Sequence, residues 1–95
     1  GNYVTDGPFL HRNSKGELTM LWSSFFEGGY ALAMAHSKSN TIDGPWVQDP
    51  ELIFGENGGH GMLFNDLSGN LMVTLHSPNV DLKERPVFFK IDKDI

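Results

Sequence analysis

The feature that most constrains this chain of 95 residues is an internal repeat at an offset of 53 residues. Four positions or segments are aligned with each other at this offset: Gly16 with Gly69, Leu18 with Leu71, Phe9-Leu10 with Met62-Leu63, and Ala35 with Phe88. A period near ~50 residues with up to four antiparallel strands per unit is typical of β-propeller blades. Two stacked β-meanders of another all-β fold are the alternative that the repeat alone leaves open.

Eleven glycines and five prolines divide the sequence into short apolar runs, and no segment keeps a helical period for three turns. The alanine-rich segment 30–37 suits a strand or a short helix, but its length and the preceding Gly28-Gly29 favour a strand. Strands are expected at 8–11, 18–25, 30–37, 62–64, 71–76 and 87–91, with a turn into an edge strand at 44–47 and turns near 14–17 and 66–70. The pattern predicts an all-β chain of antiparallel, four-stranded meanders.

These strands divide the chain 1–95 into about two blades of a β-propeller. Blade one spans about residues 5–50, and an incomplete final blade without its outer strand spans about 58–95. A chain of this size buries a modest fraction of its surface, so two such units are expected to need further support.

Composition excludes several classes of partner and site. Seven basic residues against twelve acidic ones give a formal net charge of −5, which argues against non-specific binding of nucleic acid. The sequence contains no basic amphipathic helix of the kind that binds an anionic membrane surface. No apolar run approaches the ~20 residues that are needed to span a bilayer. Without cysteine, neither a disulfide framework nor a thiolate metal site is available. No signal peptide is visible at the N-terminus, and the sequence does not indicate a cellular compartment.

The repeat predicts where an axial site would lie. At the same offset Asp6 and Gly7 correspond to Gly59 and His60, at the beginning of the first strand of each unit. In a propeller that strand lines the central channel. The side chains of Asp6 and His60 are therefore expected to point toward a common axial pocket from neighbouring blades.

Four segments, taken in order, resemble glycoside hydrolase family 43, whose members are five-bladed β-propellers that cleave plant-type polysaccharides by inversion. The segments are Thr5-Asp6-Gly7-Pro8-Phe9-Leu10, the run 30–39 followed by Gly44-Pro45-Trp46, Gly58-Gly59-His60-Gly61-Met62, and Leu75-His76-Ser77 with Arg85-Pro86. The resemblance covers nearly the whole chain and concerns the C-terminal blades only. It implies arabinose-type or xylose-type glycosidic bonds as substrates, and a secreted or periplasmic location would fit the family.

The resemblance implies a general acid at Asp6, where the family has Glu in a Glu-Gly-Pro segment. The aspartate is one methylene shorter, and a turn role before Gly-Pro is the alternative. Inverting hydrolysis needs two carboxyl groups about 6.5–9.5 Å apart. The family's catalytic base and its pKa-tuning aspartate would lie in upstream blades, so the isolated chain is predicted to be inactive.

His60 is the candidate axial ligand. In the family the matching histidine reaches a metal or water site on the axis, while an ordinary turn position is the alternative for a histidine between glycines. A calcium ion at the axis is compatible with this, although calcium prefers oxygen ligands and would take most of its shell from water. The sequence contains no metal motif of its own, and no cofactor is required.

Four further residues are candidates for substrate binding. Phe26 and Tyr30 flank the glycine-rich loop 27–29, and His76 follows from the family resemblance. Arg85 lies near the end of the last loop, where a salt bridge with Asp81 or Glu84 is the alternative. The implied partner is a carbohydrate. The function favoured is part of a glycosidase, and the alternatives are a non-catalytic carbohydrate-binding module or a truncated inactive remnant.

Two neighbouring blades also present apolar faces that a full ring would cover. We therefore expect either missing N-terminal blades or self-association as a homodimer or higher oligomer, with blade faces or outer edges at the interface. Trp22, Phe88 and Phe89 are the residues expected there.

Overall fold

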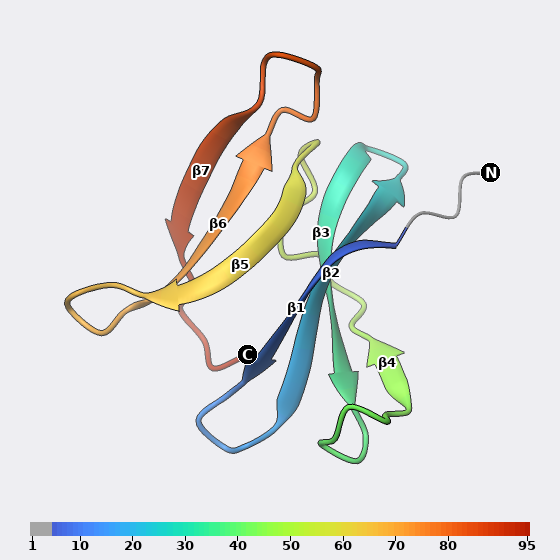
Figure 1. Ribbon diagram of the computed structural model, residues 1–95, viewed down its shortest axis with the longest axis vertical. Helices are drawn as coiled ribbons and strands as arrows, with labels where there is room; N and C mark the ends of the chain where they lie inside the picture. Colours follow the sequence, from blue (N-terminus) through green and yellow to red (C-terminus); the bar gives the residue numbers. More distant parts are fainter. Residues whose placement is uncertain (1–4) are drawn as a thin grey trace.

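The computed structural model describes residues 5–95, which form seven strands in two antiparallel sheets (Figure 1). The first sheet has the order β1-β2-β3-β4, with β1 at Asp6–Arg12, β2 at Leu18–Phe26, β3 at Gly29–Ser37 and β4 at Trp46–Gln48. The second has the order β5-β6-β7, with β5 at Gly59–Asn65, β6 at Leu71–Ser77 and β7 at Arg85–Lys90. The prediction of an all-β chain of antiparallel meanders is confirmed, including the strand at 30–37. Because residues 5–95 contain no helix, none of them forms a helical segment that crosses a bilayer.

The same turn chemistry closes the first hairpin of each sheet. Asn13 Oδ1 accepts hydrogen bonds from the amides of Lys15 and Glu17 at 3.0 and 2.9 Å. At the equivalent place in the second sheet, Asp66 Oδ1 accepts from the amides two and four residues further on, at 2.9 and 2.8 Å. Short side chains that bond to the backbone in this way favour turns over continued strands. Both predicted turns are therefore present.

The repeat extends to a backbone irregularity at the beginning of each sheet. The β1–β2 register shifts between Asp6 and Phe9, and the β5–β6 register shifts between Gly59 and Met62. Gly7 and His60, which are 53 residues apart, have positive φ angles of 53° and 56°. Bulges of this kind bend a strand and redirect its side chains. Both sheets therefore begin with the same bend.

In the third strand the offset is 54 residues rather than 53, which corrects one predicted equivalence. Met20 pairs with Ala35, and its counterpart Val73 pairs with Phe89. Ala35 therefore corresponds to Phe89 and not to Phe88. The stretch of chain from Val73 to its partner Phe89 is one residue longer than the stretch from Met20 to its partner Ala35. A slip of one residue moves a side chain to the other face of a sheet.

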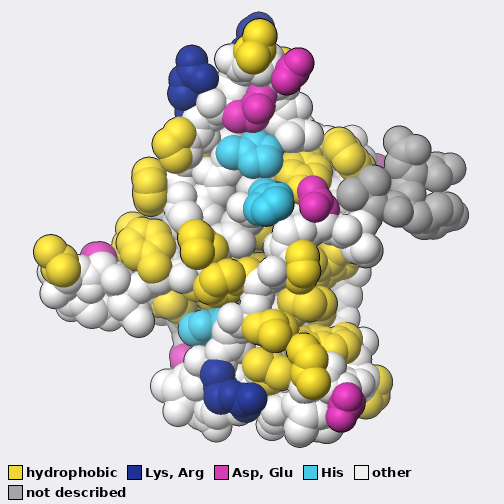
Figure 2. All heavy atoms as spheres, in the orientation of Figure 1, with side chains coloured by type: hydrophobic (Ala, Val, Ile, Leu, Met, Phe, Trp, Pro, Cys, Tyr) yellow, Lys and Arg dark blue, Asp and Glu magenta, His cyan; other side chains and the backbone are white. Residues whose placement is uncertain are grey.

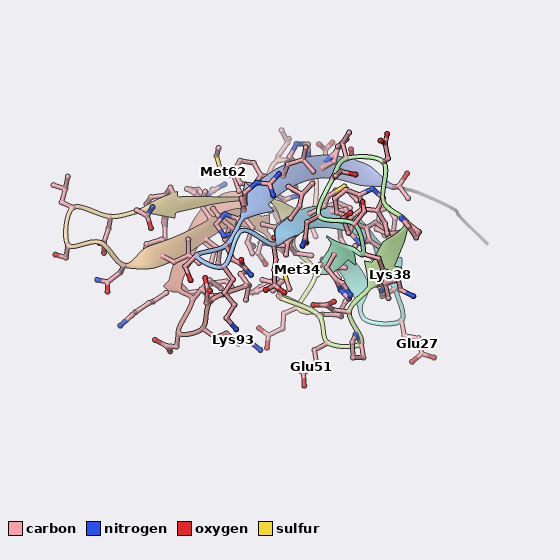
Figure 3. All side chains as sticks on the ribbon, turned by 90° about the horizontal axis from the view of Figure 1, so that it is seen from below. Glu27, Met34, Lys38, Glu51, Met62 and Lys93 are labelled. Carbon is pink, nitrogen blue, oxygen red and sulfur yellow. The ribbon has the colours of Figure 1, made fainter. Side chains whose placement is uncertain are left out.

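The core lies between the two sheets. In Figure 1, β5 runs alongside β1 and β2, and the face of the first sheet that packs against the second bears Leu21, Leu32 and Met34. From the second sheet, Leu63, Val73 and Leu75 complete the buried cluster. The molecule is flat, with extents of 38 × 37 × 18 Å, as the edge-on view of Figure 3 shows.

The C-terminal segment returns to the first sheet and closes one end of the core. The carboxylate of Asp94 accepts hydrogen bonds from the amide of Ser14 at 3.0 Å and from its hydroxyl at 2.5 Å. The bonds from the Ser14 hydroxyl and amide hold the pKa of Asp94 below its usual value. Ile95 is 5% exposed and packs in the core cluster. On the same side, Lys93 Nζ lies 3.9 Å from the carboxylate of Glu51 (Figure 3).

Candidate functional site

The candidate site lies where β1 and β5 begin. The hydroxyl of Tyr30 donates to Asp6 Oδ2 at 2.8 Å, and His60 Nδ1 lies 3.9 Å from the same carboxylate oxygen. Asp6 and His60 come from different sheets, and the structure brings them together as the repeat predicted. Figure 2 shows histidine and acidic side chains side by side on this face of the molecule. Both side chains are about half exposed, at 50% for Asp6 and 59% for His60, so a ligand has access to them.

A buried hydroxyl holds the backbone of His60 in its unusual conformation. The amide of His60 donates to Ser23 Oγ at 2.7 Å, and Ser23 is fully buried in β2. Non-glycine residues adopt positive φ at some cost in free energy, and they keep it where the surroundings favour it. Ser23 therefore helps to aim the His60 imidazole toward Asp6.

Two glycines allow the strands to approach closely at this point. A Cβ atom on Gly7 would lie 2.9 Å from Cγ of His60, and Gly7 also has a positive φ. A Cβ atom on Gly59 would lie 2.7 Å from Ser23 Oγ and 2.8 Å from Cε2 of Tyr30. A side chain at either position would displace the groups that form the site.

Tyr30, a predicted substrate-binding residue beside the loop 27–29, is buried. It lies in β3, as the strand predicted at 30–37 requires, and it is 4% exposed. Burial, together with the hydrogen bond to Asp6, raises the pKa of Tyr30 to about 12. The phenol therefore stays protonated and donates to Asp6 Oδ2 across the physiological pH range.

The ring of His76 packs against the ring of Tyr30. The two rings stack with centroids 5.7 Å apart and an interplanar angle of 19°. His76 Nε2 lies 2.8 Å from Oδ1 of Asn79. The backbone amide of Asn79 donates to the backbone carbonyl of Asn57. Asn57 Oδ1 accepts from the amide of Tyr30 at 3.1 Å. These contacts fix His76 within the network that surrounds Tyr30.

The other two candidates lie further from this cluster. Phe26 ends β2, is half-buried and packs on Trp22 with ring centroids 6.2 Å apart. Arg85 begins β7 and is exposed, and its Nη1 donates to the backbone carbonyl of Glu84 at 2.8 Å. Within residues 5–95 Arg85 forms no ion pair, so the predicted salt bridge with Asp81 or Glu84 is absent there.

Phe25 is an aromatic residue beside the site that is not among the four predicted substrate-binding residues. Its side chain is 48% exposed, and its ring centroid lies 5.1 Å from that of Tyr30. Phe25 pairs with Tyr30 across β2 and β3, so both side chains lie on the same face of the sheet. The signal available in the sequence was this hairpin register, because the alternation of a strand assigns Phe25 and Phe26 to opposite faces.

A cleft of ≈ 400 Å³ lies next to His60, between the beginnings of β1 and β5. Its lining includes Gly7, Phe9, Met62, Thr74 and Pro86. Among residues 5–95 no three His, Cys, Asp or Glu side chains are grouped to hold a metal ion. One imidazole and one carboxylate fall short of the six to eight oxygen ligands of calcium. These residues alone therefore do not form a calcium site.

The fold and site together define a class of protein: an all-β repeat protein in which two meanders bring a carboxylate, a phenol and an imidazole to the beginning of their first strands. The chain is similar to an endo-arabinase from Bacteroides thetaiotaomicron, whose crystal structure matches it with a TM-score of 0.87 and 47% sequence identity. The match covers 96% of this chain and 32% of the endo-arabinase chain, so this chain spans about a third of that protein's length. No protein-family model matches the sequence, and neither does any curated protein.

Proposed function

We propose that this chain is part of a glycoside hydrolase that cleaves arabinose-type polysaccharide by inversion. The observation that carries the proposal is the 47% identity to an endo-arabinase over 96% of this chain. The contact of Asp6 with Tyr30 and the approach of His60 add a polar cluster beside a cleft. In this proposal the chain supplies the C-terminal blades of a five-bladed propeller of family 43, with blade one at about 5–50 and an incomplete final blade at about 58–95.

Asp6 is the proposed general acid. It would protonate the glycosidic oxygen as the bond to the anomeric carbon breaks, while a second carboxylate activates the attacking water. The second carboxylate would come from the remainder of the propeller, about 6.5–9.5 Å away. Tyr30 is a positioning residue in this scheme, because its hydroxyl fixes Asp6 Oδ2 at 2.8 Å.

His60 lines the axial side of the same cleft and would contact the substrate or an axial water. A calcium ion on the axis would find one nitrogen ligand here, directly or through water, and its remaining ligands would be supplied by water or by other blades. The acid role of Asp6 is independent of such an ion.

The exposed ring of Phe25 is the proposed sugar-stacking surface at the edge of the site. Aromatic rings present apolar area at low entropic cost, and this ring lies beside Tyr30, which itself contacts Asp6. Of the predicted substrate-binding residues, His76 lies in the cluster and Arg85 lies at the exposed beginning of β7. Phe26 is the least suited of the four, because it is half-buried against Trp22.

A chimaera tests the proposed activity. The matching third of the Bacteroides endo-arabinase is replaced by this chain, and arabinan hydrolysis is measured as released reducing ends. We expect an active chimaera in which Asp6→Asn lowers kcat by about 10²–10⁴-fold. Asp43→Asn, in an exposed loop, is the matched control and should keep full activity. A folded Asp6→Asn chimaera with normal kcat would refute the acid assignment.

The same chimaera separates catalysis from simple binding. A folded protein that binds arabinan without cleaving it would favour the carbohydrate-binding alternative. Phe25→Ala should raise KM with little change in kcat, because the ring contacts sugar remote from the broken bond. Phe26→Ala is the control for loss of an aromatic ring, and its effect should appear in stability rather than in KM.

A further inference from the structure

The segment that leads into β5 contains Asn57-Gly58, the one Asn-Gly pair of the sequence. Asparagine followed by glycine is the pair most prone to spontaneous deamidation, because glycine has no Cβ to shield its amide nitrogen and its backbone turns freely. The reaction needs no enzyme and no cofactor. Its rate depends on whether the Asn57 side chain can approach the Gly58 nitrogen.

The reaction consumes only the chain itself and water. The Gly58 nitrogen loses its proton and attacks Cγ of Asn57, the Cγ–Nδ2 bond breaks, and ammonia leaves with that proton. The cyclic imide then adds water at one of its two carbonyl groups. One opening gives aspartate, and the other gives isoaspartate, in which the main chain passes through the former side-chain carbonyl and is one methylene longer.

In the folded chain the backbone of Tyr30 holds both reacting groups. The amide of Gly58 donates to the Tyr30 carbonyl at 2.8 Å, and the amide of Tyr30 donates to Asn57 Oδ1 at 3.1 Å. The attacking nitrogen and the carboxamide are therefore each bonded to the same residue of β3 and not directed at one another. Both bonds must break before the imide can form.

The second sheet encloses the same pair. The amide of Asn79 and the hydroxyl of Ser77 donate to the Asn57 carbonyl at 2.8 and 3.4 Å. Gly58 is buried, and a Cβ atom there would lie 2.5 Å from the carbonyl oxygen of His76. In Figure 1 the segment that leads into β5 lies between β3 and β6. The backbone rotation that closes the imide therefore has no room while the two sheets are packed.

We propose that Asn57-Gly58 is a deamidation site which the packed fold keeps closed and which opens only when the second sheet separates from Tyr30. The rate of modification then follows the population of the open chain, as it does for other reactions that require local opening. The inference concerns the chain's own chemistry and is independent of the proposed glycosidase activity.

The two products differ in their fit to the folded chain. The aspartate product keeps an oxygen in the place of Oδ1, so it can still accept from the amide of Tyr30. The isoaspartate product lengthens the main chain just before Gly59, where an added Cβ atom would already lie 2.7 Å from Ser23 Oγ. The extra methylene is therefore incompatible with both sheet contacts at once, and this product should not regain the native pairing.

Deamidation is followed by mass spectrometry of the proteolytic peptide that contains Asn57-Gly58, after incubation of the chain at neutral pH. The folded chain is compared with the chain unfolded in guanidinium chloride, and circular dichroism verifies both states. We expect the folded chain to react more slowly by about 10²-fold or more, because the reaction waits for opening. Equal rates in the two samples would overturn the proposal.

Two isoleucine variants test whether opening controls the rate. Ile95→Ala removes a core side chain and should raise the rate in native buffer about tenfold or more, in proportion to its loss of stability. Ile42→Ala, at a 62% exposed position, is the matched control and should keep the wild-type rate. An unchanged rate in Ile95→Ala, with a lowered denaturation midpoint, would show that Asn57 reacts within the folded chain and would refute the gating.

The products provide a second test. Asn57→Asp creates the aspartate product directly and should give the circular dichroism spectrum of the wild-type chain. The isoaspartate form, separated by chromatography after incubation in denaturant, should fail to recover that spectrum on refolding. An isoaspartate form that refolds as stably as Asn57→Asp would contradict the tight fit inferred at Gly59.

Discussion

The hydroxyl of Tyr30 donates a hydrogen bond to Asp6 Oδ2 at 2.8 Å. This contact joins the beginning of β3 to the beginning of β1, across the intervening strand β2. Tyr30 also stacks on His76 of the second sheet. One buried ring therefore connects the carboxylate of Asp6 in the first sheet to the imidazole of His76 in the second.

The ionisation of Tyr30 should lower stability at high pH. Its pKa is raised to about 12 in the folded chain from a usual value near 10, so the folded state holds the proton more tightly than the unfolded state does. The contribution of this group is complete below pH 10 and is lost as the pH rises toward about 12. The free energy of unfolding, measured by urea denaturation across this range, should fall.

Tyr30→Phe provides the control for this prediction. The variant should be less stable at neutral pH by about 1 kcal/mol, the typical net contribution of one hydrogen bond. It should also lose the late phenol ionisation from the absorbance titration and show a flatter decline of stability above pH 10. An unchanged titration in the variant would contradict the assignment of the raised pKa to Tyr30.

Replacing Gly59 by alanine should destabilise the chain by about 1–3 kcal/mol, as expected for overpacking. The added Cβ would meet Ser23 Oγ and the Tyr30 ring at 2.7 and 2.8 Å, and both groups belong to the site. Gly16→Ala is the matched control, because no atom lies within 4 Å of its added Cβ, although its φ of 82° carries a conformational cost. Thermal denaturation of the two variants measures the difference. In Gly59→Ala the Tyr30 phenol should also titrate earlier, and an unchanged titration would argue against displacement of the ring.

Ile95 should contribute to stability although it is the last residue of the sequence. It is 5% exposed and packs in the core between the sheets, so Ile95→Ala should cost about 2 kcal/mol. Ile42, which is 62% exposed, provides the matched control, and Ile42→Ala should lie within about 0.5 kcal/mol of wild type. Equal denaturation midpoints for the two variants would show that the C-terminal segment does not hold the core.

The isolated chain should not hydrolyse arabinan or aryl arabinosides at enzymatic rates. In the proposed mechanism Asp6 supplies only the acid, and no water is activated without a second carboxylate. Release of reducing sugar or aryl alcohol by the purified chain provides the measurement. Turnover that disappears in Asp6→Asn would show that the chain, or an assembly of its copies, supplies a base as well.

Local chemistry made much of the fold predictable from the sequence. The alternation of short apolar runs with glycine and proline is incompatible with long helices, and the turn-forming Asn13 and Asp66 mark the hairpins. The offset of 53 residues placed Asp6 opposite His60, because strands that begin at equivalent points of a repeat meet at the same end. These inferences need only periodicity, spacing and turn preference, which are properties of neighbouring residues.

Only the tertiary structure decided which aromatic side chains face the site. One extra residue between the paired positions Val73 and Phe89 moved the counterpart of Ala35 from Phe88 to Phe89. The β2–β3 register exposed Phe25, while Phe26 packed on Trp22. Burial of Tyr30, and its hydrogen bond to Asp6, depend on the packing of one sheet against the other. A strand's two faces are equivalent until it pairs and packs, so no local pattern determines which side chain becomes buried and which stays exposed to a ligand.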